Sequence, residues 1–120
     1  DKLFGGTGND NMNGGAGKDT FVFNTALGAG NVDRISGFSV ADDTIELSKS
    51  VFSSLELGAL GANAFRLGTA ATEADDRIIL NSETGELMYD ADGLGGASAV
   101  RFATLSGTNG IVSASDFIII

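Results

Sequence analysis

Large apolar residues recur every nine positions at the start of the chain, at Leu3, Met12 and Phe21. An aspartate stands two positions before each of them: Asp1, Asp10 and Asp19. A fixed period of this kind is typical of stacked repeats, in which each repeat contributes one short strand and one side chain to a shared core. The pattern therefore predicts three-residue strands separated by turns.

Two near-copies of one turn phrase, GGTGND at 5–10 and GGAGKD at 14–19, lie between these apolar residues. Glycine permits a tight turn whose carbonyls point inward, and the closing aspartate adds a carboxylate. Each nonapeptide is expected to form half a coil, so that a repeat stacks on the second repeat after it. The glycines concerned are Gly5, Gly6, Gly8, Gly14, Gly15 and Gly17.

Short apolar or β-branched runs with turn-forming residues between them follow residue 20, and they indicate an all-β fold. The segment 76–93 predicts a β-hairpin in which Gly85 takes a positive φ. Residues 48–55 predict one short helix, since apolar residues recur there at helical spacing behind Ser48 as a cap. Further strands are predicted at 20–23, 33–38, 43–47, 64–67, 99–107 and 116–120.

The charge of the chain narrows the range of functions that it could have. Sixteen acidic and seven basic residues give a formal net charge of −9, which argues against nucleic acid and anionic membranes as partners and makes a cation the natural counter-charge. The chain has no cysteine and no histidine, which excludes disulfides, thiolate metal sites and the Ser-His-Asp triad. No two glutamates are placed as a glycosidase acid and base. A single, non-catalytic module is therefore expected.

Stacking of the turns would bring aspartates and backbone carbonyls together in a column, where like charges repel unless a cation lies between them. Calcium suits such a site because it accepts six to eight oxygen ligands, whereas zinc and copper prefer nitrogen or sulfur. By the stacking rule, Asp1 shares one side with the turn 14–19. The turn 5–10 needs either a turn upstream of this chain or the degenerate GAGNVD at 28–33 as its partner. We expect one or two complete Ca2+ sites.

The repeats resemble those of the RTX family, secreted bacterial proteins whose nonapeptides fold into a parallel β-roll on binding calcium. The likeness extends to the runs GGAGKDTFVF, DRISGFSVADDTIELS and DDRIILNSETGELMYDADGLGGASAVRFATL, the last of which resembles a hairpin of their C-terminal caps. The resemblance implies a short parallel β-roll over 1–35 that continues into an antiparallel, β-sandwich-like cap over 36–120. It also implies that Asp33 and either Asp42 or Asp43 close the last calcium sites.

The end of the chain carries a second family signal. Proteins of this family leave the cell by type I secretion, and an acidic residue followed by several apolar ones is a frequent C-terminal address. The resemblance implies a secreted, extracellular protein whose partners are calcium and the type I secretion machinery. The alternative for this segment is a closing strand of the cap. The signal is expected within 100–120, at Asp116, Phe117, Ile118, Ile119 and Ile120.

Two functions from different classes follow. The first is a monomeric calcium-binding module that folds on extracellular calcium. The alternative is an accessory module that binds polysaccharide or a cell surface for a secreted enzyme such as a protease, lipase or epimerase. DADG at 90–93 lacks the glutamate and flanking helices of an EF-hand and is interpreted as a plain hairpin turn. Because Asp1 falls inside a repeat, the chain is expected to be a piece of a longer protein.

Overall fold

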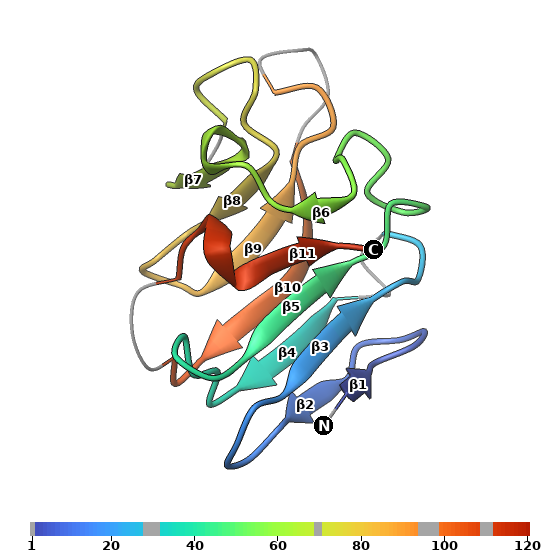
Figure 1. Ribbon diagram of the computed structural model, residues 1–120, viewed down its shortest axis with the longest axis vertical. Helices are drawn as coiled ribbons and strands as arrows, with labels where there is room; N and C mark the ends of the chain where they lie inside the picture. Colours follow the sequence, from blue (N-terminus) through green and yellow to red (C-terminus); the bar gives the residue numbers. More distant parts are fainter. Residues whose placement is uncertain (1, 28–31, 69–70, 94–98, 109–111) are drawn as a thin grey trace.

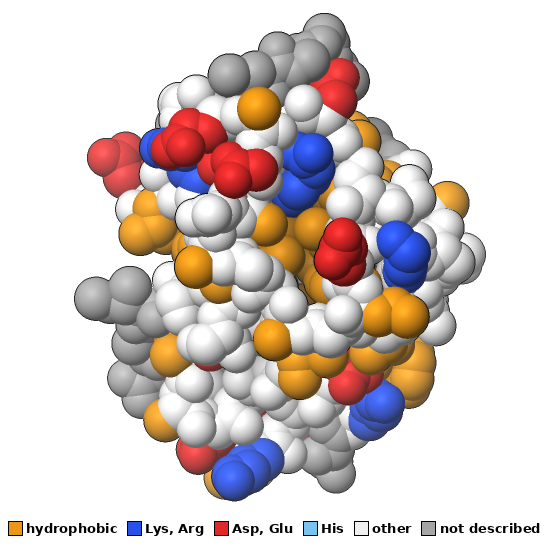
Figure 2. Space-filling view, turned by 45° about the horizontal axis from the view of Figure 1, so that its top comes forward, with side chains coloured by type: hydrophobic (Ala, Val, Ile, Leu, Met, Phe, Trp, Pro, Cys, Tyr) orange, Lys and Arg blue, Asp and Glu red, His pale blue; other side chains and the backbone are white. Residues whose placement is uncertain are grey.

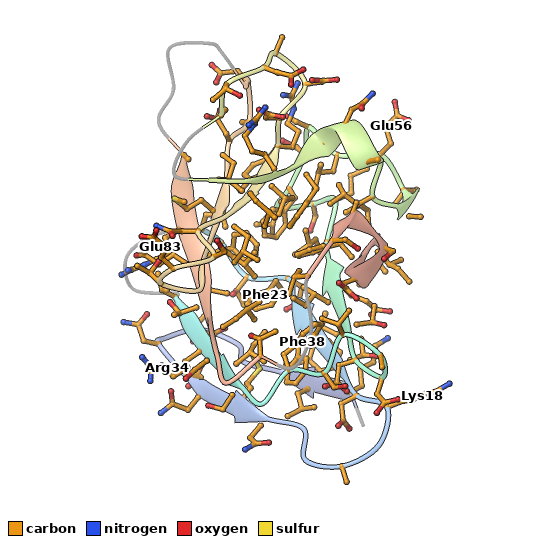
Figure 3. All side chains as sticks on the ribbon, turned by 90° about the vertical axis from the view of Figure 1, so that its left-hand side faces the viewer. Lys18, Phe23, Arg34, Phe38, Glu56 and Glu83 are labelled. Carbon is orange, nitrogen blue, oxygen red and sulfur yellow. The ribbon has the colours of Figure 1, made fainter. Side chains whose placement is uncertain are left out.

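The computed structural model describes residues 2–27, 32–68, 71–93, 99–108 and 112–120. Within them the chain forms two mixed β-sheets, which confirms the all-β class predicted from the sequence. The sheets lie face to face as two layers, and the core fills the space between them (Figures 1 and 3).

Sheet A has five strands in the order β1-β3-β5-β11-β6, and sheet B has six in the order β2-β4-β10-β9-β8-β7. The strands of sheet A are β1 (Lys2–Phe4), β3 (Thr20–Phe23), β5 (Thr44–Leu47), β11 (Phe117–Ile119) and β6 (Gly58–Ala59). Those of sheet B are β2 (Asn11–Asn13), β4 (Asp33–Ser36), β10 (Val100–Ser106), β9 (Glu86–Tyr89), β8 (Ile78–Leu80) and β7 (Phe65–Leu67). Two 3-10 turns are η2 (Ala62–Ala64) and η3 (Ala114–Asp116).

The first strands stack as the nine-residue period predicts. β1 pairs in parallel with β3, so that Leu3 lies beside Phe21, two nonapeptides later. β2 pairs in parallel with β4, and β3 pairs in parallel with β5. Each strand therefore passes over its immediate neighbour in the sequence and pairs with the next strand but one.

The later strands extend both sheets in a mixed arrangement, so the prediction of an antiparallel cap is wrong in this respect. β10 pairs in parallel with β4, and β11 pairs in parallel with β5, so both continue the ladders begun by the first strands. β7 and β8 are also parallel, whereas β8–β9, β9–β10 and β6–β11 are antiparallel. Only hairpins carry a short-range turn signal, and the parallel pairings join segments far apart in the sequence.

Aromatic side chains fill much of the space between the sheets. The ring centroids of Phe52 and Phe102 lie 5.0 Å apart with the planes nearly perpendicular, a geometry that aromatic pairs prefer. Figure 3 shows Phe23 and Phe38 between the layers, whereas Lys18 projects outward. Burial of each such ring contributes about 1.5–3 kcal/mol to the free energy of unfolding. Five phenylalanines are fully buried: Phe21, Phe38, Phe52, Phe102 and Phe117.

The segment 48–55 forms turns, so the predicted helix is wrong. The N–H groups of Val51 and Phe52 both donate to Ser48 O, and no helix continues from that turn. The hydroxyl of Ser48 lies 2.7 Å from that of Ser50 and accepts a hydrogen bond from the Ser50 N–H. Hydroxyl groups that bond locally in this way compete with a helical ladder. The apolar residues of this segment are spaced as they are because the turn packs their side chains onto the core.

The predicted hairpin over 76–93 is confirmed, because β8 and β9 run antiparallel around the turn 81–85. Gly85 adopts a φ of 81°, as predicted, and its N–H donates to Asn81 O at 2.7 Å. A Cβ at Gly85 would overlap Leu105 O on β10. The dihedral angle and the close approach of β10 therefore both require glycine.

The predicted final strand is confirmed as β11, which lies between β5 and β6 inside sheet A. Phe117 and Ile119 are buried, whereas Ile118 between them is exposed. Asp116 precedes the strand and is itself buried. Its carboxylate accepts a hydrogen bond from the Ser113 N–H at 2.9 Å, which closes the single turn of η3.

Some large apolar side chains remain at the surface. Figure 2 shows orange side chains among the charged ones on one face of the molecule. No helix in the described part of the chain is long and apolar enough to cross a membrane. The exposed large apolar residues are Phe4, Leu57, Leu67, Val100, Ile118 and Ile120.

Candidate metal centre

The two glycine turns share one backbone conformation. The second and third glycines of each turn adopt positive φ angles, 72° and 94° at Gly6 and Gly8, and 74° and 91° at Gly15 and Gly17. Only glycine adopts such angles readily. The repeat in sequence is therefore a repeat in conformation, and both turns direct their backbone groups alike.

The first glycine of each turn is required for a different reason. Neither Gly5 nor Gly14 has a positive φ. However, a Cβ at Gly5 would lie 2.9 Å from Asp33 Cγ, and a Cβ at Gly14 would lie 2.6 Å from Asp19 Cβ. Each would also overlap a carboxylate oxygen of the same aspartate. The first glycine thus makes room for a carboxylate, while the other two bend the chain.

The turn 5–10 lies against the residues that lead into β4. The Asp10 N–H donates to Asp33 Oδ1 at 2.9 Å, although these residues are far apart in the sequence. The stacking rule left two partners open for this turn, and the structure brings the end of 28–33 to it. Residues 28–31 themselves lie outside the described part of the chain.

Two carboxylates converge at this turn, and they have few partners. Asp10 Oδ2 is enclosed, and no donor among the described residues lies within hydrogen-bond distance of it. Burial raises the pKa of Asp33, the hydrogen bond from the Asp10 N–H lowers it, and the nearby charge of Asp10 raises it. A buried polar group without a partner costs about 1–3 kcal/mol, and more when it is charged. A cation between the two aspartates would therefore lower the energy of this site.

The turn 14–19 lies against the loop before β5, at the opposite edge of the stack (Figure 1). The Asp19 N–H donates to Asp43 Oδ1 at 3.0 Å, and the Ser39 N–H donates to Asp43 Oδ2 at 2.9 Å. Asp19 and Asp43 are both buried, whereas Asp42 is exposed. Of the two residues that the sequence left open, Asp43 is the one that joins the turn.

The two sites are built on one plan. Asp33 Oδ1 accepts a hydrogen bond from the Asp10 N–H, and Asp43 Oδ1 accepts one from the Asp19 N–H. Asp10 Oδ2 and Asp19 Oδ2 are both enclosed. Each turn therefore presents the same arrangement, an aspartate that ends the turn and a second aspartate from the segment stacked on it.

The donor set at both turns consists of oxygen atoms. Within the described ranges, no group of three acidic, histidine or cysteine side chains converges in a way that could hold a metal ion. A cation would need backbone carbonyls of the glycine turns in addition to an aspartate pair. Calcium accepts this mixture of carboxylate and carbonyl oxygens, whereas structural zinc sites use cysteine and histidine. The predicted ligand Asp1 lies outside the described residues.

Sequence reasoning missed two side-chain hydrogen bonds at the first glycine turn. Asn9 Oδ1 accepts a hydrogen bond from the Val32 N–H at 2.7 Å, and Thr25 Oγ1 donates to Gly6 O at 3.2 Å. The only available signal was the general preference of asparagine for turns. The second copy has Lys18 at the position of Asn9, so comparison of the copies does not mark it.

The DADG segment, 90–93, begins with a local turn. The Asp92 N–H donates to Asp90 Oδ1 at 3.2 Å, and the Asp90 N–H donates to Arg77 O at 2.8 Å. A carboxylate that bonds its own backbone two residues on is typical of a turn. Residues 94–98, which follow, lie outside the described part.

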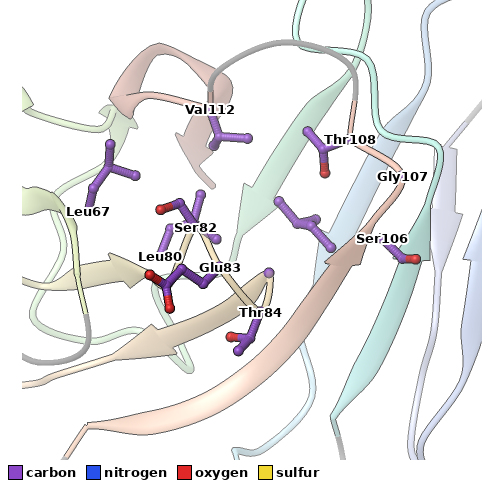
Figure 4. Close-up of a pocket in the computed structure, with 11 residues that line it drawn as sticks. Leu67, Leu80, Ser82, Glu83, Thr84, Ser106, Gly107, Thr108 and Val112 are labelled. Carbon is purple, nitrogen blue, oxygen red and sulfur yellow. The ribbon is translucent and has the colours of Figure 1, made fainter.

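A cavity of about 470 Å³ opens where the β8–β9 turn meets the end of β10 (Figure 4). Leucine side chains and Val112 form its apolar lining, and serine and threonine residues form part of its polar lining. Glu83 is the only titratable side chain among the eleven residues that line it. General acid–base catalysis needs positioned proton donors and acceptors, and this lining offers one carboxyl group without a second titratable partner.

Comparison of the chain with protein-family models, with curated proteins and with solved structures finds no match. The case for a function therefore depends on the geometry of the turns.

Proposed function

We propose that this chain is a calcium-binding module of the RTX type, in which residues 1–35 end a parallel β-roll and the remainder forms its C-terminal cap. The observation that carries the proposal is the Asp10–Asp33 pair, where two carboxylates converge and Asp10 Oδ2 is enclosed without a donor among the described residues. The parallel register of β1, β3 and β5 supports the roll.

Each ion would be held by a pair of aspartates together with carbonyl oxygens of a glycine turn. Asp10 and Asp33 would serve the turn 5–10, and Asp19 and Asp43 would serve the turn 14–19. When bound, calcium supplies the positive charge that offsets repulsion within each carboxylate pair. The chain contributes preorganisation, because its first glycines let the carboxylates reach the backbone.

The expected free energies are large enough to control folding. Extracellular calcium modules have dissociation constants of about 10⁻⁴ to 10⁻³ M. Calcium at ten times the dissociation constant adds about 1.4 kcal/mol of stability per site. A net charge of −9 disfavours the compact chain through self-repulsion. Calcium would therefore shift the chain toward the folded state wherever its concentration is millimolar.

Circular dichroism and calorimetric titration test this function. In EDTA the β signal is expected to weaken, and calcium in the millimolar range restores it while magnesium at the same concentration does not. Magnesium holds its waters and demands octahedral geometry. A spectrum and a thermal midpoint that are the same in EDTA and in calcium would overturn the proposal.

Charge-neutralising variants identify the ligands. Asp10→Asn and Asp33→Asn are expected to abolish one binding event in the titration, and Asp43→Asn is expected to weaken the other. Asp42→Asn is the matched control, because Asp42 is the exposed neighbour of Asp43 and its substitution removes the same charge. A loss of calcium response in Asp42→Asn equal to that in Asp43→Asn would contradict the assignment of Asp43.

The same proposal makes 116–120 the address for type I secretion. Phe117 and Ile119 are buried in the folded chain, so the address would be readable only before folding. Fusion of residues 100–120 to an unrelated passenger tests it in cells with a type I exporter. Retention of the passenger inside those cells would overturn this part of the proposal and leave the calcium sites untouched.

A further inference from the structure

Asn13 ends β2 and is followed by Gly14, the first residue of the second glycine turn. We propose that Asn13 is a site of spontaneous deamidation, where the side-chain amide is converted to aspartate or isoaspartate without an enzyme. Asn13 is exposed, so water reaches both the amide and the product.

The reaction needs only water as a co-reactant. The Gly14 backbone nitrogen loses its proton to solvent and attacks Asn13 Cγ, the bond from Cγ to the amide nitrogen breaks, and ammonia leaves with a proton from solvent. The product is a five-membered succinimide ring. Water then opens the ring at one of its two carbonyls. Cleavage at Cγ gives aspartate, and cleavage at the main-chain carbonyl gives isoaspartate.

The structure favours this attack in two ways. Asn13 Oδ1 accepts a hydrogen bond from the Gly15 N–H at 2.9 Å. This Asx turn folds the side-chain amide back over the following peptide, and the donated hydrogen bond polarises the carbonyl that is attacked. Gly14 has no Cβ to hinder the approach of its nitrogen. The turn also cannot accept a larger residue there, because a Cβ at Gly14 would overlap the Asp19 carboxylate.

Asn81 is a control within the same chain. Its Oδ1 accepts a hydrogen bond from the Glu83 N–H at 3.0 Å, which is the same Asx turn. The residue that follows is Ser82, whose side chain crowds the attacking nitrogen. The pair differs in the residue after the asparagine, and Asn81 is half-buried whereas Asn13 is exposed. The Asn109–Gly110 dipeptide lies outside the described residues.

The two products change the turn differently. Aspartate keeps the main chain and adds a carboxylate at the entrance of the turn 14–19. Isoaspartate adds a carbon atom to the main chain between β2 and the turn, so the pairing of Asn13 with Ser36 and the start of the turn no longer fit the same ladder. Ageing of the protein would thus alter the turn 14–19. It would spare the turn 5–10, because the residue before that turn is Phe4 and carries no amide.

Peptide mapping by mass spectrometry tests the site in the intact chain. The protein is incubated in mildly alkaline buffer, in calcium and separately in EDTA, and then digested. We expect the peptide with residue 13 to gain about one dalton, the difference between an amide and an acid, with isoaspartate detected by enzymatic methyl labelling. The peptide with residue 81 is expected to stay unchanged, and Asn13→Gln is expected to remove the new acidic species seen on ion exchange.

Circular dichroism shows whether the chain is folded in each buffer, and peptide mapping shows whether residue 13 converts, so this proposal and the proposed function can fail separately. Conversion of residues 13 and 81 at equal rates would overturn the role of the glycine. An unchanged residue 13 in the native protein, while urea-unfolded protein converts in the same buffer, would overturn the role of the folded geometry.

Discussion

Gly5 and Asp33 are in contact across the stack, so close that a Cβ on Gly5 would lie 2.9 Å from Asp33 Cγ. The contact joins the first glycine of a turn to an aspartate from the segment stacked on it. Gly5→Ala in EDTA is therefore expected to lower the free energy of unfolding by about 1–3 kcal/mol, the usual range for overpacking. Urea unfolding followed by circular dichroism measures it.

A double-mutant cycle shows whether the cost arises from Asp33. In the Asp33→Ala background the obstacle is gone, and Gly5→Ala is expected to be neutral or to stabilise by up to about 1 kcal/mol, because alanine restricts the unfolded chain. An equal loss in both backgrounds would show that the Gly5–Asp33 contact is not the cause.

Gly85→Ala is expected to be more damaging. It places a side chain at a φ of 81° and against Leu105 O, and a strained residue of this kind costs about 1–3 kcal/mol before the overlap with β10 is added. Thermal unfolding measures the loss. Gly61→Ala is the matched control, because Gly61 has a φ of −65° and nothing lies near its Cβ position. A midpoint that falls equally in both variants would contradict this explanation.

Asp76 gives the protein acid sensitivity. Burial alone would raise the pKa of Asp76, but hydrogen bonds from the Thr72 N–H, the Arg66 side chain and the Glu73 N–H lower it below its ordinary 3.8. A group with a lowered folded pKa stabilises above its unfolded pKa, and this contribution is lost as pH falls through the folded value. Asp76→Asn is expected to cost about 2 kcal/mol at neutral pH. In urea titrations the difference in the free energy of unfolding between the wild type and Asp76→Asn should shrink below pH 3.8. A difference that stays constant with pH would contradict this prediction.

The pKa of Asp116 is shifted in the opposite direction to that of Asp76, so its effect on stability has the opposite pH dependence. Burial raises the pKa of Asp116 above its ordinary 3.8, and the hydrogen bond from the Ser113 N–H lowers it by less. A raised folded pKa gives a contribution that is fully present below the unfolded pKa and is lost as pH rises through the folded value. Relative to Asp116→Asn, the wild type should therefore gain stability as pH falls from neutral toward 3.8. The same titrations in EDTA check this. A wild type that becomes less stable relative to Asp116→Asn as pH falls would contradict it.

Much of the fold could be predicted because its signals are local or strictly periodic. The nine-residue spacing of Leu3, Met12 and Phe21, together with the expectation that each nonapeptide forms half a coil, places Leu3 beside Phe21. Gly85 was predictable for a similar reason, because a hairpin turn needs a positive φ at a defined position.

The unpredictable features arise from contacts between distant segments. The sequence DD at 42–43 does not say which carboxylate turns inward, and that choice follows from the Asp43 contacts with the Asp19 and Ser39 N–H groups. The helix predicted at 48–55 fails because serine hydroxyls bond locally. The parallel pairing of β10 with β4 leaves no trace in either segment by itself.

The position of β11 makes completion of sheet A depend on segments that are far apart in the sequence. Phe117 lies beside Ile45 and Ile118 beside Ala59, so sheet A is complete only when segments from both halves of the chain meet. Closing so long a loop costs chain entropy before any contact compensates for it, and non-local parallel pairings of this kind are typical of slow folders. Folding that proceeds from one end would leave the β5 edge open until the last strand arrives, and that open edge is where the partly folded chain would be most prone to aggregate.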